Sequence, residues 1–154
     1  MVRMLPLSKI PHIKLLEIIA RVSFFKPFSL QQRELLLQRA KVYKCKAQHH
    51  IQTEHDENTN FYIVLSGEVA VMRKDAEGEV GRIKAGEFIG EGSFIQKRPK
   101  SAAAKALTDC IVLCLDQDSL SGLPNVIKDK VKDAIIEGMA KRISYLTDEI
   151  QKYK

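Results

Sequence analysis

GEFIGEGSFIQKRPKSAAAKA, from Gly86 to Ala106, is the stretch that most constrains the fold of this chain. Gly90 can adopt backbone angles that are closed to other residues, and residues 91–95 can begin a short helix directly after it. The first amides of a helix have no partner within the helix, so they face whatever lies before it. This pattern predicts a turn that binds an anion.

Charged side chains in the same stretch agree with an anionic ligand. Positive charge gathers on the return limb around Pro99, at Lys97, Arg98 and Lys100. The carboxylate of Glu91 would repel a phosphate group, so we expect it to face a group that donates hydrogen bonds, such as a ribose hydroxyl. The stretch therefore predicts a site for a small phosphate ester.

Three separated motifs resemble those of cyclic nucleotide-binding domains and occur in that family's order. Gly86-x-Phe88-x-Gly90-Glu91, followed by Pro99-Lys100-Ser101-Ala102, resembles the family's phosphate-binding cassette, and residues 86–106 are named the cassette below. Residues 24–30, FFKPFSL, resemble the entry to the family's second helix. Residues 61–69, FYIVLSGEV, resemble its strand pair.

The resemblance implies a role for each part of the cassette. Glu91 would accept a hydrogen bond from the ribose 2′-hydroxyl, Lys100 would pair with the cyclic phosphate, and the amides after Gly90 would complete the cradle. Strand residues would flank the base. The expected ligand-binding residues are Ile89, Gly90, Glu91, Gly92, Ser93, Lys100, Ser101, Ala102, Val71 and Ile83. The expected ligand is cAMP or cGMP, with no other cofactor and no metal.

Two positions of the cassette leave alternatives open. The family usually has Arg where this chain has Lys100, and an ammonium group cannot make the planar, two-pronged contact of a guanidinium. Lys100 could still bind phosphate more weakly, Arg98 could replace it, or the fold could have lost its ligand. Ser101 follows, and its hydroxyl could bond either the phosphate or a guanine edge.

The periodicity of apolar residues predicts an α+β fold. Helical spacing over residues 12–22, and the capping-box pair Ser29 and Gln32 before residues 30–40, predict two N-terminal helices within residues 1–41. Short strand-like runs follow at 42–51, 61–65, 69–73, 80–83, 102–107 and 111–115. Such runs predict an antiparallel, jelly-roll-like β-roll over residues 42–116 that carries the cassette. We expect residues 1–154 to form one domain.

A long C-terminal helix is predicted over residues 123–153. Its apolar side chains recur every three or four residues, at Ile127, Val131, Ile135, Met139, Ile143, Leu146 and Ile150. The helix could cover the roll, close over a ligand or pair with a second copy, and packing on its own domain is the favoured interpretation. Met139 and Tyr145 are the candidates for contact with a ligand base.

Composition and missing motifs exclude several classes of function. The net charge of +6 is spread along the chain, so no dense nucleic-acid patch is expected, and we expect no DNA-binding helix-turn-helix after the last helix. The His-rich segment 49–57 fits no metal-ligand scheme. No catalytic motif occurs, so we expect no enzyme.

The remaining composition predicts a cytoplasmic protein. Cys45, Cys110 and Cys114 make an odd number, and two of them lie in an apolar run, as buried thiols would in a reducing compartment. No signal peptide or membrane-spanning segment is expected. The resemblance implies a sensor that signals through its C-terminal helix to a protein partner or a second copy. The alternative is an interaction module that keeps the fold without a ligand.

Overall fold

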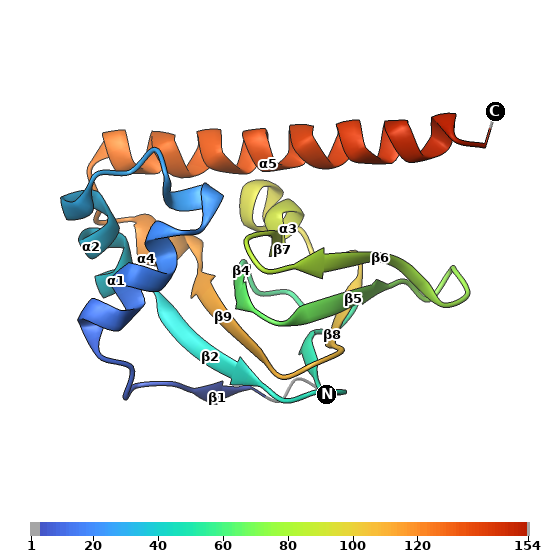
Figure 1. Ribbon diagram of the computed structural model, residues 1–154, viewed down its shortest axis with the longest axis horizontal. Helices are drawn as coiled ribbons and strands as arrows, with labels where there is room; N and C mark the ends of the chain where they lie inside the picture. Colours follow the sequence, from blue (N-terminus) through green and yellow to red (C-terminus); the bar gives the residue numbers. More distant parts are fainter. Residues whose placement is uncertain (1–3, 154) are drawn as a thin grey trace.

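Antiparallel pairing joins all the strands of the computed structural model, which describes residues 4–153 (Figure 1). The strands are β1 Leu5–Pro6, β2 Lys41–Cys45, β3 His50–Gln52, β4 Phe61–Ser66, β5 Glu68–Met72, β6 Glu79–Lys84, β7 Phe88–Ile89, β8 Ala103–Ala106 and β9 Cys110–Leu115. One sheet has the order β1-β2-β9-β4-β7, and the other has the order β3-β8-β5-β6. The two sheets form the predicted β-roll, so the α+β fold is confirmed.

Helices precede, interrupt and follow the strands. They are α1 His12–Ala20, the 3-10 helix η1 Ser23–Phe25, α2 Leu30–Arg39, α3 Glu91–Gln96, α4 Gln117–Leu120 and α5 Asn125–Gln151. The capping box predicted for α2 is present, because the side chains of Ser29 and Gln32 each accept from the other's backbone amide. Together the helices enclose one side of the roll (Figure 1).

Two apolar clusters hold these layers together. One lies between the helices and the five-stranded sheet, and it contains the fully buried Phe25, Phe61 and Ile135. The other fills the roll between its two sheets, and it includes all three cysteines. Burial raises the pKa of the Cys45 thiol to about 11. The burial predicted for Cys110 and Cys114 is confirmed, and Cys45 is buried as well.

The predicted boundaries differ from the structure in two places. The run 42–51 was expected to be one strand, but β2 and β3 belong to different sheets, and the turn between them places Gln48 at φ +71°. The amide of Ala47 donates to the Asp109 carboxylate in this turn. The short strands β1 and β7 and the short helices η1 and α4 were not predicted, because two to four residues are too few to show a period.

The long helix α5 divides into two halves with different surroundings. Ile127, Val131 and Ile135 in its first half are buried against the domain. In the second half the side chains of Ile143 and Ile150 are 62 % and 60 % exposed. The buried side chains confirm that the first half of α5 packs on its own domain, whereas these two isoleucines of the second half are exposed. Within residues 4–153 no helix combines the length and the apolarity that a membrane crossing requires.

Candidate functional site

The glycine turn of the cassette forms as the sequence predicts. Gly90 has φ +87°, a left-handed conformation, and α3 begins at the next residue. Its carbonyl accepts from the amide of Phe94 at 3.2 Å and from the hydroxyl of Ser93 at 3.1 Å. A Cβ on Gly90 would lie 2.5 Å from the carbonyl oxygen of Asn60, so glycine is required here by space as well as by angle.

Lys100 lies behind this turn with its side chain 2 % exposed. Its ammonium group donates to the carbonyl of Asn60 and to the hydroxyl of Ser93, and it lies 3.5 Å from the carbonyl of Gly90. The backbone of Lys100 also pairs with the loop before β4, through Asp56 and His55. Lys100 therefore ties the return limb of the cassette to the turn and to the start of β4.

Burial changes the charge state of this lysine. Loss of water around the ammonium group lowers the pKa of Lys100 to about 8, although the carboxylates of Glu91 and Asp56 act in the opposite direction. The ring of Tyr62 lies below it, with Nζ 5.9 Å from the ring centroid. The ammonium group of Lys100 is thus charged at neutral pH and loses its proton as the pH rises through about 8.

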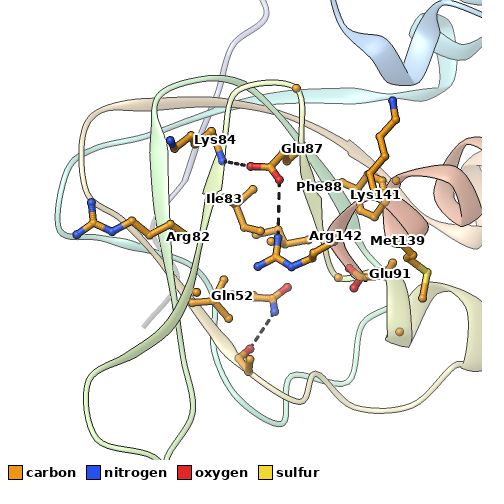
Figure 2. A pocket seen from close by; sticks show the side chains of 18 of the residues that line it. Gln52, Arg82, Ile83, Lys84, Glu87, Phe88, Glu91, Met139, Lys141 and Arg142 are labelled. Carbon is orange, nitrogen blue, oxygen red and sulfur yellow. Dashed lines mark hydrogen bonds and ion pairs between the residues drawn. The ribbon is translucent and has the colours of Figure 1, made fainter. Parts of the chain in front are cut away.

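A single cavity of about 1110 Å³ brings the predicted site residues together. The cassette, the β5–β6 hairpin and α5 enclose it (Figure 2). All ten of the predicted residues line it: Ile89, Gly90, Glu91, Gly92, Ser93, Lys100, Ser101, Ala102, Val71 and Ile83. What each of them does to a ligand stays a prediction. Within residues 4–153 no cluster of three or more His, Cys, Asp or Glu side chains is arranged to hold a metal ion.

Comparison with known proteins decides the family. The family model described as "Cyclic nucleotide-binding domain" matches residues 43–125, which is more than half of the chain and includes the cassette. The chain belongs to the cyclic nucleotide-binding domain family. The resemblance found in the three motifs is thereby confirmed.

Individual relatives of this cyclic nucleotide-binding domain agree with the family. The cAMP-dependent protein kinase regulatory subunit of Aspergillus fumigatus is 34% identical over 74 residues, which is 48% of this chain and 18% of the relative. The chain spans less than a third of the length of the curated relatives it matches.

Solved structures show the same fold. A cyclic nucleotide-binding domain from Methylobacillus flagellatus matches with a TM-score of 0.81 and 23% identity, over 98% of this chain and 89% of that one. The regulatory domain of Toxoplasma gondii PKA, crystallised with cAMP, matches with a TM-score of 0.66 and 21% identity, over 79% of this chain and 48% of that one.

Gln52 lines the cavity of this cyclic nucleotide-binding domain, and no sequence signal pointed to it. Its side chain is 5 % exposed, and its Nε2 donates to the carbonyl of Ala102 at 2.9 Å. Its Oε1 is buried and has no hydrogen-bond partner within residues 4–153. A buried polar atom without a partner is costly, so this oxygen marks a place where a ligand or water donor would be stabilising.

Arg98 takes a different position from Lys100. Its side chain is exposed, and its guanidinium lies over Gly92 in the first turn of α3, where a Cβ on that glycine would be 2.7 Å from Nη2. Both cations therefore border the cavity. Lys100 and Arg98 therefore both remain candidates for the cation that binds the phosphate.

The helix α5 closes one side of the cavity. Gly138 allows α5 to approach closely, because a Cβ there would overlap the ring of Phe88 in β7. One turn later Arg142 points into the cavity, with Nη1 3.9 Å from the Glu87 carboxylate (Figure 2). Met139 and Tyr145, the residues expected to contact a base, also line the cavity.

Proposed function

We propose that this domain binds a purine cyclic nucleotide, cAMP or cGMP, in the cavity between the cassette, the β5–β6 hairpin and α5. The observation that carries the proposal is this cavity, which combines a left-handed glycine turn, a buried cation and a carboxylate with an apolar strand face. Small-molecule sites are typically concave and apolar with a few converging polar groups. Membership of the family supports the same ligand class.

The cavity suggests one orientation for the ligand. The phosphate would lie against the amides after Gly90, with Lys100 or Arg98 supplying the positive charge. The ribose would face Glu91, and the base would lie toward Val71 and Ile83. This orientation places opposite charges together and leaves the apolar strand face for the flat base.

Binding would be transmitted by α5, since this helix contacts both the cavity and solvent. A ligand that binds one position of α5 more tightly shifts the population of the helix toward that position. The exposed stripe of α5, defined as Ile136, Met139, Ile143, Leu146 and Ile150, would present this change to a partner. Met139 and Leu146 also line the cavity, so the stripe and the ligand site share side chains.

A thermal melt tests the binding function. At about 100 times its Kd, a nucleotide that binds only the folded state raises the free energy of unfolding by about 2.7 kcal/mol. We expect cAMP or cGMP to produce such a shift, and guanosine, which lacks the cyclic phosphate, to produce a smaller one. A melting temperature unchanged by both cyclic nucleotides would support the rival function, an interaction module without a ligand.

The Glu91→Ala variant tests where the ligand binds. We expect a weaker affinity by about 1.5–3 kcal/mol in calorimetry, because a carboxylate that accepts ribose hydroxyls contributes charged hydrogen bonds to the complex. Glu77→Ala is the matched control, since Glu77 is exposed and lies outside the cavity. Equal affinities in the two folded variants would remove Glu91 from the site.

We propose a second copy of this chain as the partner of α5. The stripe alternates spacings of three and four residues, with Ile at one set of positions and Met or Leu at the other. In two-stranded parallel coiled coils, Ile at position a with Leu at position d is the favoured pattern. The side chains of the stripe are exposed, whereas Ile127, Val131 and Ile135 in the first half of α5 are buried against the domain.

Ile143→Glu is expected to give a monomer where the parent chain is a dimer, as measured by sedimentation equilibrium. A charge placed in the apolar contact between two α5 helices has no partner and is costly to bury. Ser144→Glu adds the same charge to the next residue, which lies off the stripe, and should leave the dimer intact. A parent chain that stays monomeric at high concentration would contradict this proposal.

A further inference from the structure

The β5–β6 hairpin presents one face to the cavity, and this face has a gap in it. In the strand register Val71 pairs with Gly81 and Val69 pairs with Ile83, so these four residues share a face. Val71, Gly81 and Ile83 line the cavity. Because Gly81 has no side chain, the face is open at that point.

The side chain of Arg142 reaches this gap from α5. A Cβ on Gly81 would lie 2.9 Å from its Nη2, so the guanidinium lies against the backbone of β6. Figure 2 shows the side chain extending from the helix into the cavity, between Ile83 and Glu91. The guanidinium therefore lies at the strand side of the cavity, against β6.

Most of the hydrogen-bonding capacity of Arg142 is unused. Its contact with the Glu87 carboxylate is 3.9 Å long, beyond hydrogen-bond distance, and that carboxylate already accepts from the amide of Lys84 at 2.8 Å. Within residues 4–153 this long ion pair is the polar contact that the guanidinium makes, and it donates no hydrogen bond. A guanidinium carries only donors, arranged in a planar fork. Arg142 thus offers a pair of parallel donors to whatever lies on the strand face.

Purine bases differ in how they match such a fork. Guanine presents two acceptors side by side, O6 and N7, whereas adenine presents the acceptor N7 beside the donor N6 amine. Arg therefore bonds guanine with two hydrogen bonds, and the adenine amine would oppose one of its N–H groups. The carboxylate of Glu87 is the ion-pair partner of Arg142 within residues 4–153, at 3.9 Å.

We propose that Arg142 recognises the O6 and N7 edge of a 6-oxopurine, so that the domain prefers cGMP to cAMP. This inference rests on the proposed binding of a cyclic nucleotide and names the base that the same site selects. The base would lie on the strand face at Val71 and Ile83, and α5 would supply the recognising side chain.

Calorimetry with cGMP, cAMP and cIMP tests the inference. The base of cIMP keeps O6 and N7 but lacks the guanine amine, so it isolates the edge that Arg142 faces. In the parent chain cGMP and cIMP should both bind about 5- to 150-fold more tightly than cAMP. Arg142→Gln should reverse or remove this preference, because a Gln amide matches the N6 and N7 edge of adenine.

Lys132→Gln is the matched control, because it removes one positive charge from an exposed position of the same helix. Loss of charge alone would weaken the binding of all three nucleotides equally, since they carry the same phosphate. The ratio of the affinities for cGMP and cAMP would then be unchanged. A ratio that moves in Arg142→Gln and stays constant in Lys132→Gln supports the inference.

Two results would overturn it in different ways. If the nucleotides bind but the ratio is near one, or is the same in Arg142→Gln as in the parent, Arg142 does not recognise the base, although the binding function stands. If neither cGMP nor cAMP binds the parent chain, the proposed function fails and the inference fails with it.

Discussion

Gly90→Ala is expected to lower the free energy of unfolding by about 2–5 kcal/mol and to abolish detectable binding of cyclic nucleotides. A left-handed conformation costs a residue with a Cβ about 1–2 kcal/mol, and overpacking adds about 1–3 kcal/mol. The new Cβ would meet the Asn60 carbonyl at 2.5 Å and the Lys100 ammonium at 2.9 Å. Both groups belong to the network that fixes the cassette, so the turn must shift.

Gly86→Ala is the control that separates the cost of a left-handed backbone conformation from the cost of steric overlap by the new Cβ. Gly86 has φ +93°, close to that of Gly90, but a Cβ there would meet no atom within 4 Å. In a thermal or denaturant melt, the free energy of unfolding of Gly86→Ala should fall by only about 1–2 kcal/mol, and the variant should still bind the nucleotide. If the two variants behave alike, the contact among Gly90, Asn60 and Lys100 does not hold the cassette in place.

Lys100→Arg is expected to tighten cyclic-nucleotide binding. It is also expected to remove the loss of affinity that the parent chain should show at alkaline pH. A guanidinium adds a second parallel hydrogen bond to the phosphate, worth about 1 kcal/mol or more. Burial lowers the pKa of Lys100 to about 8 in the free protein, so the ammonium form is present below that pH and is lost above it. The affinity of the parent chain should therefore be constant below about pH 8 and fall as the pH rises further. Arginine stays protonated throughout this range.

Calorimetry at about pH 7 and about pH 9 on four proteins distinguishes the candidate cations. If Lys100 binds the phosphate, Lys100→Ala should weaken binding by about 1.5–3 kcal/mol and Arg98→Ala should have a small effect. If Arg98 binds it, only Arg98→Ala should abolish binding and the alkaline decrease should be absent. Tighter binding by Lys100→Ala than by the parent would contradict a phosphate cradle that uses Lys100.

Local signals in the sequence were sufficient for much of the candidate site. The glycine at position 90 followed by Glu91 predicted both the left-handed turn and the start of α3, because these depend on few consecutive residues. The same holds for the capping box at Ser29. Gln52 could not be predicted, since its burial beside the cassette results from the pairing of β3 with β8 across a long separation in the chain.

The surroundings of the Lys100 side chain could not be predicted from the residues next to it in the cassette. Its position after Pro99 indicated a cation on the return limb, but the sequence could not show that its ammonium is enclosed by the carbonyl of Asn60 and the hydroxyl of Ser93. Arg142 is a similar case. Nothing in the helical spacing distinguishes it from exposed neighbours such as Lys141, and only the approach of α5 at Gly138 brings it to the strand face.

The sequence by itself determined the order and type of the main elements, the roll, the turn at Gly90 and the residues of the cassette, because periodicity, capping and glycine angles act between near neighbours. Only the tertiary structure decided which half of α5 is covered, how Lys100 is buried and which side chains close the cavity with the cassette. These features depend on contacts between segments far apart in the chain. The free energy of such contacts comes from the surface that they bury together, which no single segment encodes.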